Sequence, residues 1–204
     1  MNTNLLRKII RQTMLKERLL TETRSSTYFH MSTDKFDSFE QQYKEGWALS
    51  DVGFHFGTKD TAMAAADKLI QEGRVKSGEA VFLYSVDLFI DSSIRLQESR
   101  GGNWNVSSIL RQMFEGFGGG QHPSISEEEL DNYYEDIVIA PSGENIKDLG
   151  WDPQLEMEAF ESWFTNLGFD SIVYDNTFEG GGDSVIVFDP SQIVINDVEE
   201  YQVP

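Results

Sequence analysis

The chain of 204 residues is 39% hydrophobic and 25% charged, a composition that is typical of one soluble globular domain and excludes a disordered chain. Its 35 acidic and 16 basic residues give a formal net charge of -19, which repels a phosphate backbone and makes nucleic acid an unfavourable partner. No cysteine is present, so disulfides, thiolate nucleophiles and cysteine-bound zinc are excluded, and the three separated histidines do not indicate a metal site.

The N-terminal segment has apolar residues at helical spacing between residues 3 and 22, with Lys and Arg between them, which predicts an amphipathic helix. Such a helix packs on its own domain or docks on a partner or membrane surface, and both alternatives stay open. The segment lacks the apolar run of a secretory signal, and no stretch approaches the length of a membrane span. We therefore expect a cytoplasmic protein with a helix at 1–25 and a domain at 26–204.

Two short strands and a helix are predicted next. Residues 26–33, "STYFHMST", are rich in aromatic and hydroxyl side chains, and "GFHFGT" at 53–58 alternates in the manner of a strand. The alanine-rich stretch after it favours a helix, which Thr58 and Asp60 are suited to cap and Gly73 to end. The order is strand, strand, helix.

A long apolar run from Ala80 to Ile90 predicts a buried central strand. Residues 91–150 are irregular, with glycine clusters on both sides of a short helix expected from Ser107 to Phe114. An acidic helix is expected from Ser126, where Glu129 three residues later completes a capping signature. We interpret 91–150 as a mostly helical insertion packed on the side of a sheet.

The last third is regular again. Residues 153–168, "PQLEMEAFESWFTNLG", place their large apolar side chains on one helical face and end at a glycine. Two strands follow, "DSIVYDN" and "SVIVFD", joined by the glycine-rich connection "TFEGGGD" and closed by Pro190.

Three of these segments, "FHMS", "GFHFGTKDTAMAAA" and "GFDSIVYDNTFEGGGDSVIVFDPSQI", occur in an order and spacing that resemble ADP-ribosyltransferases of the diphtheria-toxin and poly(ADP-ribose)-polymerase type. The closest resemblance is to divergent transferase domains of phages and polyvalent proteins, and it covers roughly residues 26–195. It implies an α+β fold in which two packed antiparallel sheets surround a cleft for NAD, the substrate that donates ADP-ribose.

The resemblance also implies site residues on the first two strands. The family's histidine matches His30, which would orient the nicotinamide ribose, and the backbone of Met31 would hold the carboxamide, with Ser32 at a position often occupied by Ser or Thr. The family's tyrosine position holds His55, beside Phe54, and a flat imidazole can stack on nicotinamide. The alternative is that His55 faces solvent on the strand face opposite its phenylalanine neighbours.

The family's catalytic glutamate falls on Ser184. A carboxylate there would stabilise the positive charge that develops on the ribose as the glycosidic bond breaks, and a neutral hydroxyl supplies no such charge. Asp183 and Glu179 precede it in a glycine-rich stretch, so either one is a candidate replacement, and both are equally interpretable as turn residues.

We expect a mono-ADP-ribosyltransferase that modifies a protein, with a phage protein acting on a host protein as the implied setting. The alternative is a protein that keeps the fold but has lost catalysis and acts as a binding, inhibitory or virion-packaged component. Ser184, at the position of the family's glutamate, is the reason for this alternative. A Ser-His-Asp hydrolase lacks a GxSxG motif here. Several aromatic residues are candidates to line a nucleotide cleft or to pack in the core: Tyr28, Trp47, Trp104, Tyr133 and Tyr134.

Overall fold

A computed structural model describes residues 27–40, 51–98, 104–115, 153–177 and 179–203. The predicted helices at 3–22 and from Ser126 lie outside the described residues. The described part contains seven strands, three α-helices and one 3-10 turn: β1 (Thr27–Ser32), β2 (Phe54–Phe56), α2 (Lys59–Gln71), β3 (Ala80–Leu88), β4 (Ser93–Leu96), α3 (Val106–Glu115), α5 (Pro153–Asn166), β5 (Ser171–Asp175), β6 (Asp183–Val187), the 3-10 turn Pro190–Gln192 and β7 (Ile193–Gln202). Within this part, no helix is long and apolar enough to cross a membrane.

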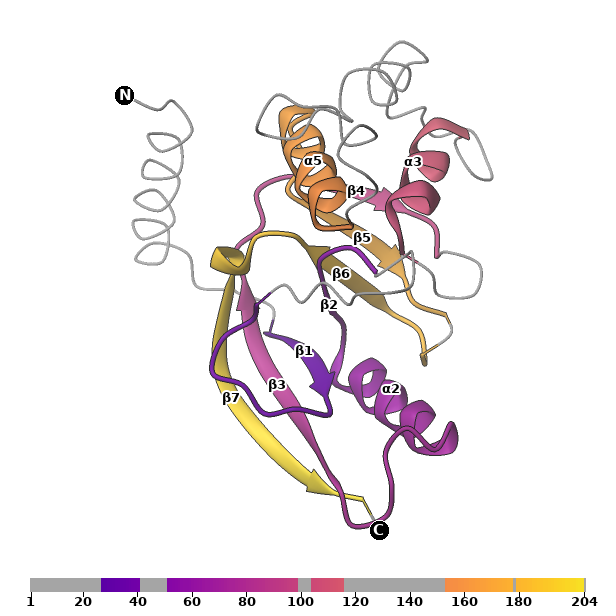
Figure 1. Ribbon diagram of the computed structural model, residues 1–204, viewed down its shortest axis with the longest axis vertical. Helices are drawn as coiled ribbons and strands as arrows, with labels where there is room; N and C mark the ends of the chain where they lie inside the picture. Colours follow the sequence, from indigo (N-terminus) through magenta and orange to yellow (C-terminus); the bar gives the residue numbers. More distant parts are fainter. Residues whose placement is uncertain (1–26, 41–50, 99–103, 116–152, 178, 204) are drawn as a thin grey trace.

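The strands form two sheets (Figure 1). The first has the order β1-β3-β7 and is antiparallel throughout. The second has the order β2-β6-β5-β4 and is antiparallel except for the parallel β4–β5 pair. A bridge between Phe29 and Gly57 joins the two sheets, with backbone N–H to O distances of 2.9 and 3.0 Å. The predicted α+β fold with two mainly antiparallel sheets is therefore confirmed.

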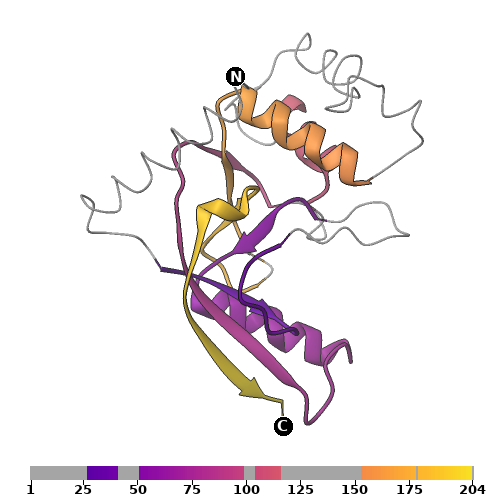
Figure 2. The ribbon, with the colours of Figure 1, turned by 60° about the vertical axis from the view of Figure 1, so that its left-hand side comes forward.

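Apolar cores lie on both faces of the second sheet. On one face, Ile172 and Ile186 pack with residues of α3 and α5, including Phe160, and α5 lies over this sheet in both ribbon views (Figures 1 and 2). On the other face, Val185 and Phe56 pack with residues of the first sheet. Alternation along β6 explains the division, because neighbouring residues of a strand point to opposite faces.

Most predicted elements are confirmed. Thr58 is the N-cap of α2, and its hydroxyl accepts a hydrogen bond from the Thr61 N–H at 3.1 Å. The helix ends at Gln71, just before Gly73, and β3 is the central strand of the first sheet. The short helix expected from Ser107 forms as α3.

Two strands are not anticipated from the sequence. Within the range interpreted as an insertion, β4 pairs with β5 and so belongs to the second sheet itself. After β6, the chain turns at Pro190, where the Asp189 side chain accepts a hydrogen bond from the Ser191 N–H at 2.8 Å. It then enters β7, which pairs with β3 in the first sheet. The turn redirects the chain because proline lacks the N–H that would continue the ladder.

The entry to β2 requires a glycine. Gly53 has a φ of 63°, and a Cβ at this position would lie 2.4 Å from the carbonyl oxygen of Val187. Gly73 has a φ of 70° with open space around it. We expect Gly53→Ala to lower the free energy of unfolding by several kcal/mol and Gly73→Ala by about 1 kcal/mol, the cost of the left-handed backbone alone. Urea unfolding of both variants measures this, and equal losses would contradict it.

Candidate active site

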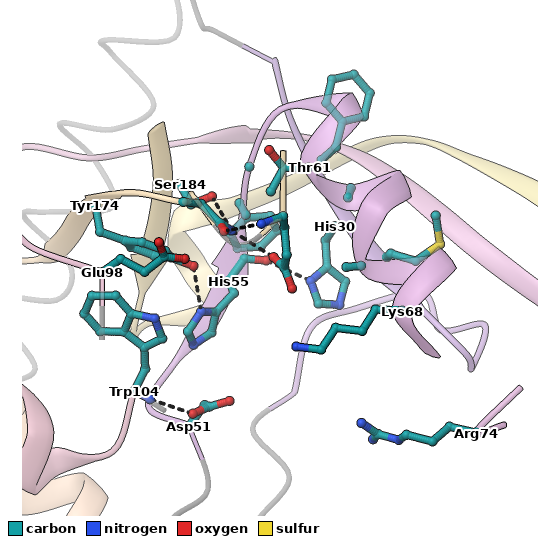
Figure 3. A pocket seen from close by; sticks show the side chains of 18 residues that line it. His30, Asp51, His55, Thr61, Lys68, Arg74, Glu98, Trp104, Tyr174 and Ser184 are labelled. Atoms are coloured by element: carbon teal, nitrogen blue, oxygen red, sulfur yellow. Dashed lines mark hydrogen bonds between the residues drawn. The ribbon is translucent and has the colours of Figure 1, made fainter. Parts of the chain in front are cut away.

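A cavity of about 610 Å³ lies where β1, β2 and α2 meet the loop between β5 and β6 (Figure 3). Its volume is in the range of small-molecule and cofactor sites. The first two strands, α2 and the segments around the second sheet all contribute to its lining: Phe29, His30, Met31, Asp51, His55, Phe56, Gly57, Thr61, Ala62, Ala65, Lys68, Arg74, Glu98, Trp104, Tyr174, Asn176, Glu179 and Ser184.

His30 of β1 lies among aromatic rings and beside the backbone of β2. The centroids of the Phe39 and Phe56 rings are 5.3 and 5.6 Å from that of the imidazole, and Nδ1 is 2.8 Å from the carbonyl oxygen of His55. Burial lowers the pKa of His30 to about 4, so the ring is neutral near pH 7. Because a carbonyl oxygen only accepts, Nδ1 carries the proton and donates it. Nε2 is then left with a lone pair that can accept a hydrogen bond.

His55 occupies the next strand and forms part of the cavity wall. Its Nδ1 is 3.4 Å from the Tyr174 hydroxyl, and its Nε2 is buried without a hydrogen-bond partner among the described residues. Burial lowers the pKa of His55, against the opposing influence of Asp51, so this imidazole is also neutral near pH 7. A buried nitrogen without a partner carries a desolvation cost, which a bound ligand can offset.

Tyr174 is a site residue that the sequence analysis misses. It extends from β5, its ring centroid is 4.3 Å from that of Trp104, and burial raises the pKa of its hydroxyl, with the carboxylate of Glu179 as the next cause. The hydroxyl therefore keeps its proton. The signal in the sequence is the period of the predicted strand, which places Ile172, Tyr174 and Asn176 on one face.

Asn176 organises the loop after β5 and is likewise missed. Its backbone N–H donates to the Gly182 carbonyl at 2.9 Å, and its side-chain oxygen accepts from the Glu179 N–H at 3.1 Å. Its amide nitrogen, Nδ2, donates to the Glu179 carboxylate at 2.8 Å and to the Ser184 hydroxyl at 3.2 Å. One buried amide thus fixes the Glu179 carboxylate at the edge of the cavity.

The two candidate carboxylates differ in position. Glu179 lines the cavity, whereas Asp183 is not among the lining residues. The Asp183 carboxylate is exposed and accepts two hydrogen bonds from the Arg95 guanidinium, at 2.8 and 2.5 Å. This pairing holds the pKa of Asp183 below its ordinary value. The structure therefore brings Glu179 together with both histidines and leaves Asp183 on the surface.

Of the remaining predicted site residues, two line the cavity and two do not. Met31 and Ser184 line the cavity. Ser32 is outside the lining, and its hydroxyl accepts a hydrogen bond from the Asp34 N–H at 3.1 Å. Phe54 is also outside the lining and packs against the core between the sheets.

No protein-family profile matches the chain, and the search of curated proteins finds no match. A search of solved structures finds a chain from the crystal structure of the M. tuberculosis MbcT–MbcA toxin–antitoxin complex. The two chains share 12% identity with a TM-score of 0.40, over 88% of this chain and 85% of that chain. A TM-score this low does not establish a shared fold.

Charges are divided across the cavity. Three carboxylates, those of Asp51, Glu98 and Glu179, line it together with Trp104, whereas its cationic lining residues, Lys68 and Arg74, lie at the end of α2 and just after it. Among the described residues, no group of His, Asp and Glu side chains has an arrangement that would hold a metal ion.

Proposed function

We propose that the protein breaks the bond between nicotinamide and ribose in NAD and transfers ADP-ribose to a protein. The observation that carries the proposal is the convergence of His30, His55 and Glu179 on one cavity from three separate segments. The Glu179 carboxylate, held by Asn176, supplies the negative charge that Ser184 lacks.

The backbone of β1 offers a place for the carboxamide. Phe29 exchanges both of its backbone hydrogen bonds with Gly57, so its N–H and C=O point away from β3. By the period of the strand, those of Met31, two residues later, point the same way, and Met31 lines the cavity. A carboxamide has a donor and an acceptor that complement this pair of backbone groups.

The wall formed by His55, Tyr174 and Trp104 suits the nicotinamide ring of NAD, which is flat and positively charged. Aromatic side chains attract a cationic ring, and the nearby Asp51 and Glu98 carboxylates add favourable charge. On the other side, the free lone pair of His30 Nε2 accepts a hydrogen bond from a ribose hydroxyl. These contacts orient the bond that breaks.

Glu179 acts on the charge that develops during the reaction. When the bond between the ribose C1′ and the ring nitrogen breaks, its electron pair leaves with nicotinamide, and the ribose carries positive charge. A carboxylate fixed beforehand stabilises that charge more than it stabilises the substrate, which lowers the barrier. A nucleophilic group of the acceptor then bonds to C1′ and gives its proton to Glu179 or to water.

A second candidate is a binding protein that has lost catalysis. Ser184 favours it, because the strand position at which the family carries its glutamate holds a buried, neutral hydroxyl. An acidic chain of this kind would bind a basic protein, and that binding would weaken with rising salt and not depend on NAD.

The transfer proposal is tested with NAD that carries a label in its adenylate half. We expect the wild-type protein to release nicotinamide and to label a protein acceptor. His30→Asn keeps a donor where Nδ1 stands but lacks Nε2, so its rate should fall by about 100-fold. The control Thr33→Ala changes an exposed residue outside the cavity lining and should retain the wild-type rate. Absence of both nicotinamide and label with the wild-type protein would refute transfer and favour the binding protein.

A further inference from the structure

We propose that Lys68 and Arg74 form a subsite for the diphosphate of the dinucleotide. The proposal rests on the proposed function for the identity of the ligand, and it concerns the end of the cavity that the histidines and Glu179 do not use. Its chemistry is the recognition of a diphosphate diester by one ammonium and one guanidinium group.

The two cations lie at one end of an extended site. Figure 3 shows Lys68 and Arg74 on one side of His30, and Tyr174 and Trp104 on the other. In NAD the diphosphate follows the nicotinamide ribose. A ligand whose ring lies against the aromatic wall and whose ribose contacts His30 therefore directs its diphosphate toward the two cations.

Local structure fixes both positions. Lys68 is in the last turn of α2, and Arg74 follows the turn at Gly73. The backbone N–H of Arg74 donates to the Leu69 carbonyl at 2.9 Å, which holds this residue against the helix end. Gly73 has a positive φ, which reverses the chain here and places Arg74 among the lining residues of the cavity.

The net negative charge of the chain means that Lys68 and Arg74 matter for the binding of an anionic ligand. A protein with a net charge of -19 repels an anionic ligand, so binding of a diphosphate requires local cations. Lys68 and Arg74 are the only cations among the described lining residues. The division of charge matches the dinucleotide, because its nicotinamide ring is cationic and its diphosphate is anionic.

Two other basic residues, Lys59 and Arg95, are already committed to ion pairs. Lys59 binds Glu199 at 2.9 Å, and Arg95 binds Asp183. In the described part of the chain, Lys68 forms no ion pair within 4 Å, and the one ion pair of Arg74 is a long contact of 3.8 Å with its exposed neighbour Glu72. The two lining cations are therefore available to a ligand.

The test compares two ligands that differ in the diphosphate. ADP-ribose contains it and nicotinamide riboside lacks it, and calorimetry measures the Kd of each for the wild-type protein and for Lys68→Gln/Arg74→Gln. Because hydrogen bonds between charged groups are strong, we expect the double variant to bind ADP-ribose about 100-fold more weakly than the wild type and to bind nicotinamide riboside with the same Kd. Lys76→Gln, an exposed lysine outside the cavity lining, is the matched control and should bind both ligands as the wild type does.

Three results would overturn the subsite. The wild type and the double variant could bind ADP-ribose with equal affinity, or the double variant could lose equal affinity for both ligands. The third is that the wild type does not bind ADP-ribose. Failure of the transfer proposal gives a different result. If ADP-ribose binding depends on the two cations but NAD yields no nicotinamide, the subsite stands and transfer fails. If the double variant releases nicotinamide from NAD and labels the protein acceptor with unchanged KM, transfer stands and the subsite fails.

Discussion

Glu179→Gln should reduce the release of nicotinamide from NAD by about 100- to 1000-fold, the usual effect of removing one group that stabilises transition-state charge. The amide of glutamine keeps the size of the side chain and an oxygen that can still accept the hydrogen bond from Asn176. NAD affinity should therefore change little, and the loss should appear in kcat. Single-turnover nicotinamide release, together with calorimetric NAD binding, measures the two effects separately.

The matched variant is Asp183→Asn, four residues along the same loop and strand. Asp183 is exposed, lies outside the cavity lining and pairs with Arg95, so its replacement should leave kcat unchanged. If Asp183→Asn lost activity while Glu179→Gln kept it, the assignment of the carboxylate would be wrong. Loss in both variants would require Asp183 to act on the site through Arg95 or the loop.

The second large effect concerns the stability of the protein toward acid. The pKa of His30 is about 4 in the fold, against an ordinary value of 6.5. The unfolded chain therefore takes up a proton on His30 as the pH falls below about 6.5, while the folded protein does not, and stability is lost over that interval. Between about pH 7.5 and pH 5, this histidine should lower the free energy of unfolding by about 2 kcal/mol.

Comparison with His30→Asn isolates this effect, because asparagine does not titrate and keeps a donor toward the His55 carbonyl. Urea unfolding of both proteins across this pH interval, which lies above the sequence pI of about 4.3, gives the difference directly. The wild-type protein should lose stability relative to the variant as the pH falls. His55, whose pKa is also lowered, is present in both proteins, so the comparison reports on His30. Parallel curves would contradict a neutral, largely shielded His30.

Much of the fold follows from local patterns in the sequence. The N-cap at Thr58, the central strand from Ala80 and the helix at 153–168 are all predicted, because each depends on capping or periodicity within one segment. β7 is not, because its place beside β3 depends on a crossing between sheets after Pro190. β4 is short, and it is a strand only through its pairing with β5.

The candidate site, like the fold, is predicted from the sequence only where local patterns or the resemblance indicate its residues. The resemblance leads to His30 and His55, and the structure places the Nδ1 of one 2.8 Å from the carbonyl oxygen of the other. The sequence leaves Glu179 and Asp183 equivalent, because what separates them is Arg95, which is distant in sequence and pairs with only one of them. Tyr174 and the two cations, Lys68 in the last turn of α2 and Arg74 just after it, are likewise site residues only once the sheets are assembled.

Calorimetric titration of the purified protein with NAD, followed in the same sample by an assay for nicotinamide, shows whether the cavity binds NAD and cleaves it. We predict saturable binding of one NAD per chain with release of nicotinamide, because the cavity offers matched groups for the carboxamide, the ribose and the developing charge. No binding of NAD would contradict it, and the cavity that His30, His55 and Glu179 line would then serve another ligand.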